Sequence, residues 1–191
     1  MSRLPDGPQL MRIVVKTAET EKPMLASHDI VIDTFRPPDH QAFAELNRVW
    51  LTEYGLLEAP DERQLVNPVQ EIIGPGGQIF LARRNGEVVG TCAVLPHEAD
   101  VLELVKLAVA PGAQGLGLGR RLVEACLTFA RDRGARRVVL LSNSQLGAAL
   151  RLYESLGFRR LPMPPDAAYL TADVYMELDL SAQPAARRLV P

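Results

Sequence analysis

A glycine-rich stretch in the middle of the chain, "VAPGAQGLGLGRR" over residues 109–121, constrains the fold more than any other segment. Four of the eight positions from 112 to 119 are glycine. Glycine costs backbone entropy inside helices and strands, so this density predicts a turn that takes positive φ angles or approaches another group closely. The residues before it predict a strand and those after it an amphipathic helix.

A strand, a glycine-rich turn and a helix N-terminus together favour a phosphate ligand, because backbone N–H groups converge at the positive end of the helix dipole. Two common phosphate loops are excluded by spacing. A dinucleotide fingerprint needs glycine where Arg120 stands, and a Walker loop needs lysine and a hydroxyl where Leu118 and Gly119 follow Gly117. The stretch therefore predicts a phosphate ester bound by a loop that is neither a dinucleotide fingerprint nor a Walker loop.

The chain of 191 residues predicts one α/β domain over 28–180. Residues 1–27 form an N-terminal extension with room for one extra strand, and 181–191 are expected to be a flexible tail. Asn85 and Gly86 predict a type I′ turn within a hairpin. The expected elements are strands at 29–35, 100–110, 136–142 and 173–180, the hairpin at 78–96, and helices after Asp39, after Pro60, at 117–133 and at 144–158.

The composition of the chain argues against some classes of binding partner. A formal charge of −2 and an estimated pI near 5.9 provide no basic field for nucleic acid or an anionic membrane. The sequence has no leader pattern and no run of apolar residues that could span a bilayer, which predicts a cytoplasmic location. The isolated Cys92 and Cys126 predict core residues, and with three scattered histidines they form neither a disulfide framework nor a metal site.

The segment Gln114–Gly119, "QGLGLG", resembles the [Arg/Gln]-x-x-Gly-x-[Gly/Ala] signature of the GNAT family of N-acetyltransferases. Three more segments support the resemblance by their order and spacing: "LELVKLAVAP" just before the signature, "LLSN" at 140–143 and "ALRLYESLGF" at 149–158. Ser142 stands where threonine is common and keeps the hydroxyl. The resemblance covers residues 29–180, with its most specific part at 103–158.

The resemblance implies a fold and an activity. The fold would be a mixed, mostly antiparallel sheet with helices on both faces. The activity would be transfer of an acetyl group from acetyl-CoA to a primary amine by direct attack in a ternary complex, with coenzyme A as the product. The acceptor would be a small molecule or a protein amine, and a homodimer is left open. A non-catalytic acetyl-CoA-binding sensor or adaptor on the same fold is the alternative.

The same resemblance assigns the donor site. The pyrophosphate would accept hydrogen bonds from the loop amides. Arg120 and Arg121 would contact the remaining phosphate charge of the donor, or else be surface residues at the start of the helix. Leu107 and Val109 would border the pantetheine arm, and the Leu107 N–H would polarise the acetyl carbonyl. Asn143 would bond the arm from the next strand unless it only shapes a turn. The loop residues concerned are Gln114, Gly115, Leu116, Gly117, Leu118 and Gly119.

Two residues are candidates for proton transfer. Tyr153 matches the tyrosine that protonates the leaving sulfur in the family, although helical spacing alone would make it a core residue. Glu103 is the candidate base, because alternation along the strand predicts that it shares an apolar face with Val105, Leu107 and Val109. A solvated edge carboxylate is the alternative for Glu103. Trp50 is expected in the core rather than in an acceptor wall.

Overall fold

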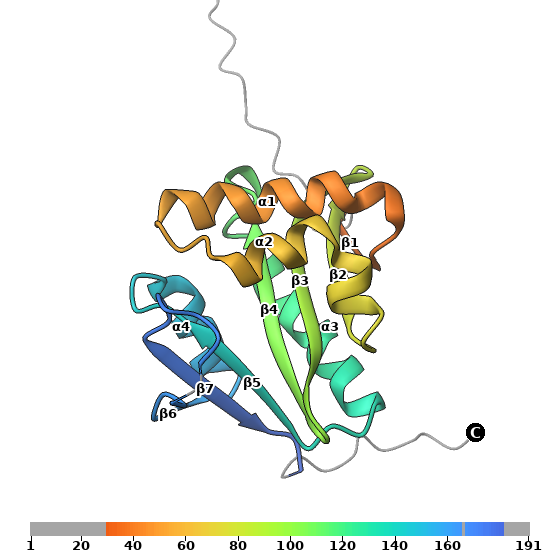
Figure 1. Ribbon diagram of the computed structural model, residues 1–191. Coiled ribbons are helices and arrows are strands. Elements are labelled where there is room, and N and C mark those ends of the chain that lie inside the picture. Colours follow the sequence, from red (N-terminus) through yellow and green to blue (C-terminus); the bar gives the residue numbers. More distant parts are fainter. Residues whose placement is uncertain (1–29, 166, 182–191) are drawn as a thin grey trace, which may run out of the picture.

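The computed structural model describes residues 30–165 and 167–181, which form one seven-stranded sheet flanked by helices (Figure 1). The strand order is β1-β2-β3-β4-β5-β7-β6, and only β4 and β5 are parallel. The sheet is thus mixed and mostly antiparallel, as predicted. The strands are β1 (Ile30–Thr34), β2 (Gln78–Arg84), β3 (Glu87–Glu98), β4 (Val101–Val109), β5 (Arg137–Ser142), β6 (Arg159–Leu161) and β7 (Val174–Asp179).

Helices cover both faces of the sheet, which confirms the expected layers. On one face, α1 (His40–Glu53), α2 (Ala59–Val66) and the π-helical turn η3 (Val69–Ile73) enclose a core that includes Phe43, Leu65 and Ile72. On the other face, α3 (Leu118–Asp132) and α4 (Gly147–Ser155) cover a larger core. Cys92 and Cys126 are fully buried in this second core as free thiols, as predicted.

Local sequence signals explain most element ends. Asn85 and Gly86 have φ angles of 53° and 86°, which suits a type I′ turn between β2 and β3. Gly134 has a φ of 75° directly after α3 and ends that helix. Strand β6 was not predicted, because its three residues are all exposed and carry no alternation. The segments 1–27 and 182–191 lie outside the described residues, so the predicted extra strand and tail are not addressed by the structure.

Strand β4 contains a bulge at Lys106, which has the left-handed φ of 57°. Thr91 of β3 pairs with Ala108 and Ala93 pairs with Val105, so β4 carries one more residue than β3 in this interval. The extra residue reverses the alternation. Val105 packs toward α1, whereas Leu107 and Val109 pack toward α3. The prediction that Glu103 and Val105 share a face with Leu107 and Val109 was therefore wrong.

Strands β4 and β5 separate along their length. Their pairing runs from Val101 and Arg137 to Glu103 and Val139 and stops there, although β4 continues to Val109 and β5 to Ser142. Figure 1 shows the two strands diverging toward the end of the sheet that lies under α1. The edge of β4 that faces β5 therefore lacks a neighbouring strand beyond Glu103.

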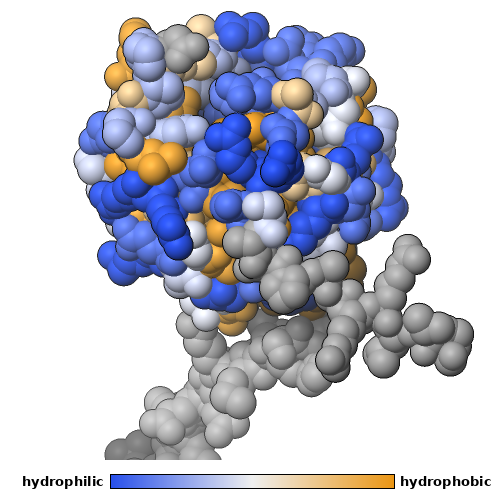
Figure 2. Space-filling view, turned by 90° about the horizontal axis from the view of Figure 1, so that it is seen from below, coloured by the Kyte–Doolittle hydropathy of each residue, from blue (hydrophilic) through white to orange (hydrophobic). Residues whose placement is uncertain are grey.

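The helices of the described residues can be compared with the length and apolar character that a membrane span requires. Within residues 30–165 and 167–181, no helix has the length and apolar character needed to cross a bilayer. Figure 2 shows one end of the molecule, where hydrophilic side chains predominate and apolar ones form small areas among them.

Candidate active site

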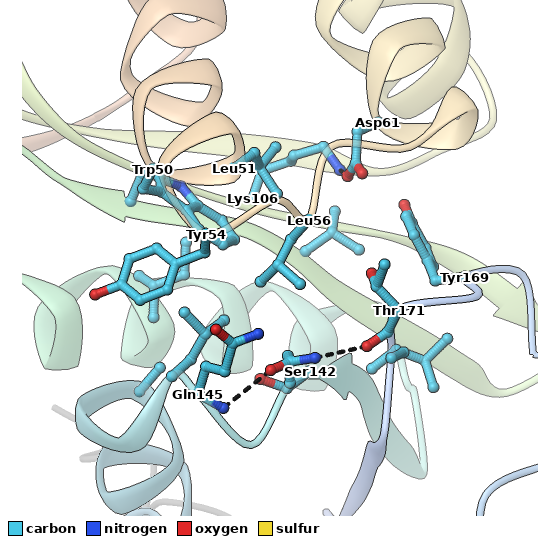
Figure 3. A pocket seen from close by; sticks show the side chains of 18 of the residues that line it. Trp50, Leu51, Tyr54, Leu56, Asp61, Lys106, Ser142, Gln145, Tyr169 and Thr171 are labelled. Carbon is cyan, nitrogen blue, oxygen red and sulfur yellow. Dashed lines mark hydrogen bonds and ion pairs between the residues drawn. The ribbon is translucent and has the colours of Figure 1, made fainter.

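A cavity of about 290 Å³ lies where β4 and β5 diverge. Its walls come from the second half of β4, the end of β5, the start of α4, the end of α1 and the connection between β6 and β7. Figure 3 shows Trp50, Tyr54 and Leu56 along one side of this cavity, with Ser142, Gln145 and Thr171 across from them. The separation of the strands thus creates the site.

The glycine-rich stretch forms the turn between β4 and α3 beside the cavity. Gly115 and Gly117 have φ angles of 80° and 72°, and Gly117 is the N-cap of α3. A Cβ at either position would meet no atom within 4 Å, so these glycines face open space. A Cβ on Gly119 would lie 3.2 Å from Leu152 Cδ2, which shows that Gly119 lets α3 and α4 approach. An open loop at a helix N-terminus fits a pyrophosphate.

The two arginines after the loop have different partners. Arg120 Nη2 donates to Ser155 Oγ at 2.7 Å, and its Nη1 lies 3.6 Å from Glu124 Oε1. Arg121 Nη2 donates to the backbone carbonyl of Ile30 at 2.9 Å. Arg121 therefore braces β1 against α3, while Arg120 is half-exposed at the start of the helix and phosphate contact by Arg120 stays a prediction.

The β4 edge supplies the wall where the pantetheine arm was predicted. Leu107 and Val109 line the cavity, and neither pairs with β5. Gln114 lines the same cavity, and its Nε2 donates a long bond of 3.4 Å to the Val109 carbonyl. A strand edge without a partner can accept an extended chain by backbone hydrogen bonding. The geometry fits the predicted donor arm.

Asn143 lies at the end of β5 and lines the cavity, but its amide already has protein partners. Its Nδ2 donates to the Thr171 carbonyl at 2.6 Å, and its Oδ1 accepts from the Gln145 N–H at 2.9 Å (Figure 3). The second bond closes a turn, so α4 begins at Gly147 rather than at the predicted 144. Asn143 thus shapes the turn and holds the β6–β7 connection, and its contact with the donor stays a prediction.

Tyr153 of α4 lines the cavity and is also part of the core between the sheet and α3. Its ring packs against Phe158 at 5.8 Å between centroids. Burial, with a smaller effect from the thiols of Cys92 and Cys126, raises the pKa of the phenol above its usual value, so the hydroxyl keeps its proton at neutral pH. Within the described residues, this hydroxyl has no hydrogen-bond partner, which suits a donor that waits for a substrate atom.

Glu103 lies at the point where β4 and β5 separate, and its side chain is 15% exposed. Burial raises the pKa of the carboxyl, and His97 and Lys106 partly oppose this effect. The half-exposed His97 places its Nδ1 3.9 Å from Glu103 Oε2. A partly desolvated carboxylate that lines a cavity has the properties of a general base.

A buried ion pair in the cavity wall was not foreseen. Lys106 Nζ lies 2.6 Å from Asp61 Oδ1, and the two side chains are 3% and 6% exposed. Asp61 also accepts the Glu58 N–H at 3.0 Å, so it belongs to the first turn of α2 as well. The pair joins α2 to the bulge of β4. An isolated lysine in an apolar strand was the one available signal, but nothing in the sequence pointed to Asp61 as its partner.

The β6–β7 connection is fastened over the cavity by Glu58. Its carboxylate accepts bonds from the backbone N–H groups of Leu170 and Thr171 and from the Thr171 hydroxyl, at 2.9, 2.8 and 2.7 Å. Burial alone would raise the pKa of Glu58, but these bonds outweigh it and the pKa is lowered. The adjacent Tyr169 places its ring 5.8 Å from Lys106 Nζ. Trp50 packs against the core on the α1 face of the sheet, as expected, and also lines the cavity.

A glycine loop at a helix N-terminus thus lies beside a cavity that is lined by an unpaired strand edge, a buried phenol and a partly desolvated carboxylate. A family model described as "Acetyltransferase (GNAT) family" matches residues 35–158. The chain therefore belongs to this family of acetyltransferases.

Solved structures support the fold. An acetyltransferase of the GNAT family from Staphylococcus aureus MU50 superposes with a TM-score of 0.73 at 20% identity, over 79% of this chain and 99% of that one. A structure of yncA, a putative acetyltransferase from Salmonella typhimurium with its cofactor acetyl-CoA, gives a TM-score of 0.64 at 22% identity, over 82% and 97% of the two chains.

A curated relative is closer in sequence over a shorter region. The mycothiol acetyltransferase of Thermomonospora curvata is 45% identical over 86 residues, which are 45% of this chain and 29% of that enzyme. The chain spans between 29% and 53% of the length of the mycothiol acetyltransferases that it matches, with 47% for the Acidothermus cellulolyticus protein.

Proposed function

We propose that this protein transfers the acetyl group of acetyl-CoA directly to a primary amine, with donor and acceptor bound together in the cavity between β4 and β5. One observation carries the proposal: a single cavity is lined by Gln114 near the glycine loop, by Tyr153 and by Glu103. A continuous cavity allows direct attack. Cys92 and Cys126, the two cysteines of the chain, are buried outside its lining, so neither is placed to carry the acetyl group.

Donor binding would use the loop and the β4 edge. The amides from Gln114 to Gly119 would hold the pyrophosphate at the start of α3, where the helix dipole favours an anion. The pantetheine arm would extend beside Leu107 and Val109, in the place that a neighbouring strand would otherwise take. The Leu107 N–H, directly after the bulge, would donate to the acetyl carbonyl and stabilise its developing charge.

Acetyl transfer then needs two proton movements. Glu103 would take a proton from the acceptor ammonium, because only the neutral amine is nucleophilic. The C–N bond forms and the C–S bond breaks, while Tyr153 protonates the sulfur of coenzyme A. A second proton leaves the nitrogen of the new amide and returns through solvent to the Tyr153 oxygen. Glu103 then releases its proton to solvent, so one proton is released per turnover and both residues recover their initial states.

The acceptor is not carried over from the mycothiol acetyltransferases, since the aligned region is less than two thirds of those enzymes. It is identified experimentally instead. Purified protein is incubated with acetyl-CoA and a panel of primary amines, free thiol is measured, and acetylated products are detected by mass spectrometry. Amine-dependent thiol release with matching product is expected. Tight acetyl-CoA binding in calorimetry, without turnover of any amine, would favour the sensor alternative.

A further inference from the structure

The charges that line the cavity are unevenly matched. Three charged residues line it within the described part of the chain: Asp61, Glu103 and Lys106. Lys106 and Asp61 neutralise each other at 2.6 Å. Glu103 is thus the charge in the lining that no lysine or arginine pairs with, and the half-exposed His97 reaches it only at 3.9 Å. The cavity carries a net negative charge when Glu103 is ionised.

Lys106 is not available to an acidic ligand. Its side chain is 3% exposed, with Asp61 on its ammonium and the Tyr169 ring 5.8 Å away. To bind a ligand carboxylate, Lys106 would have to leave Asp61 buried without a counter-charge, which is strongly unfavourable. The cavity therefore contains a lysine that cannot serve as an anchor for an acceptor carboxylate.

Aromatic side chains line the cavity on two sides. Trp50 and Tyr54 stand at the end of α1, and Tyr169 stands on the β6–β7 connection near Lys106 and Asp61 (Figure 3). Aromatic faces attract alkylammonium groups and give no counter-charge to a carboxylate. The Trp50 Nε1 atom is buried and has no hydrogen-bond partner in the described structure.

We propose that the acceptor is an aliphatic amine with no carboxylate next to its amino group, and that the enzyme discriminates against amino acids. Glu103 provides the attraction for the ammonium, and the occupied Lys106 leaves an adjacent carboxylate unpaired in a buried site. This inference rests on the proposed function, because it concerns the acceptor of that reaction.

Matched amines test the proposal. Phenethylamine is compared with phenylalanine, and isopentylamine with leucine, with kcat/KM corrected for the fraction of neutral amine at the assay pH. We expect each decarboxylated amine to be preferred by about tenfold or more. Equal rates, or a preference for the amino acids, would overturn the inference.

Variants then locate the origin of the preference. Glu103→Gln removes the base and slows acetylation of both members of a pair. The ratio of kcat/KM for the amine to kcat/KM for the amino acid is nevertheless expected to fall at least severalfold, because the unpaired negative charge is gone. Glu87→Gln, which removes an exposed carboxylate outside the cavity lining, is the control with an unchanged ratio. The double variant Lys106→Met/Asp61→Asn removes a neutral pair and keeps the preference. A ratio that shifts against amino acids in the double variant would show that Lys106 binds their carboxylate.

Binding measured without turnover separates this inference from the proposed function. Trp50 is the single tryptophan of the chain and lines the cavity, so its fluorescence reports acceptor binding in the presence of coenzyme A. Tighter binding of phenethylamine than of phenylalanine, with no acetylation of either, would uphold the inference and reject the proposed function. Equal or tighter binding of phenylalanine would reject the inference, whether or not acetyl transfer occurs.

Discussion

The Thr91 hydroxyl donates a hydrogen bond of 2.8 Å to the backbone carbonyl of Lys106. This carbonyl belongs to the bulge residue of β4, which the regular β3–β4 ladder does not serve. Thr91 is fully buried, and Asn47 Nδ2 of α1 donates to its oxygen at 3.0 Å. The bulge that sets the direction of Leu107 is therefore held by a side chain of the neighbouring strand.

Replacing Thr91 by Val keeps the shape of the side chain and leaves the Lys106 carbonyl and Asn47 without this partner. We expect the free energy of unfolding to fall by about 1–3 kcal/mol, because buried polar groups lose their hydrogen bonds. Urea unfolding measures the change. Thr128→Val is the matched control, since Thr128 Oγ1 bonds a backbone carbonyl on the exposed side of α3. Equal losses in the two variants would contradict the role of Thr91 in the bulge.

Gly117→Glu places a carboxylate at the start of α3, where the pyrophosphate is proposed to lie. Affinity for coenzyme A is expected to fall by about a hundredfold or more, as measured by calorimetry, because like charges meet and the loop amides are obstructed. Gly134→Glu is the control, because Gly134 has nearly the same φ, 75° against 72°, and the same open surroundings at the other end of the helix. Unchanged affinity in Gly117→Glu would reject the phosphate loop.

Tyr153→Phe removes only the hydroxyl. We expect kcat to fall by about a hundredfold or more through loss of the general acid, with the affinity for acetyl-CoA preserved. Because this hydroxyl makes no hydrogen bond in the described structure, the melting temperature should stay the same or rise slightly. Full activity in this variant would make Tyr153 a core residue alone, and lower stability would point to a partner bond.

Glu103→Gln has opposite effects on stability and rate. Burial raises the pKa of Glu103, so the folded state binds its proton more tightly than the unfolded state does. The resulting contribution to the free energy of unfolding is fully present below the unfolded pKa of about 4.3 and is lost as pH rises through the folded pKa. Glutamine cannot ionise, so the variant should be more stable than the parent at neutral pH and similar in acid. Thermal unfolding across this pH range measures the difference.

The rate of the same variant should depend on pH in a distinct way. At neutral pH, kcat should fall about a hundredfold or more, and it should recover as pH approaches about 10, where an alkylammonium loses its proton unaided. Parent and variant profiles that superimpose after scaling would exclude Glu103 as the base.

Local patterns were enough to predict the glycine loop, the hairpin and the helices, because glycine positions and apolar periodicity act over a few residues. The bulge escaped prediction for the same reason. The segment "LELVKLAV" is apolar apart from Glu103 and Lys106, and a lysine at positive φ carries no sequence signal, so regular alternation placed Glu103 on the wrong face relative to Leu107. The bulge is maintained by Thr91, a residue of another strand.

Polar contacts between residues far apart in the chain also could not be predicted from the sequence. Lys106 and Asp61 are 45 positions apart, and Glu58 bonds Thr171 across 113. Charged residues usually face solvent, so composition alone gave no reason to bury these side chains. They nevertheless hold α2 and the β6–β7 connection in place around the cavity.

The early end of the β4–β5 ladder, at Glu103 and Val139, has a kinetic consequence. On the proposed binding mode, the missing length of strand is supplied by pantetheine, and that part of the donor is identical before and after the reaction. Coenzyme A would keep nearly every contact that acetyl-CoA makes and lose only those of the acetyl group. Coenzyme A should therefore compete with acetyl-CoA at similar concentrations. The rate of acetylation would then follow the ratio of acetyl-CoA to coenzyme A rather than the concentration of acetyl-CoA alone.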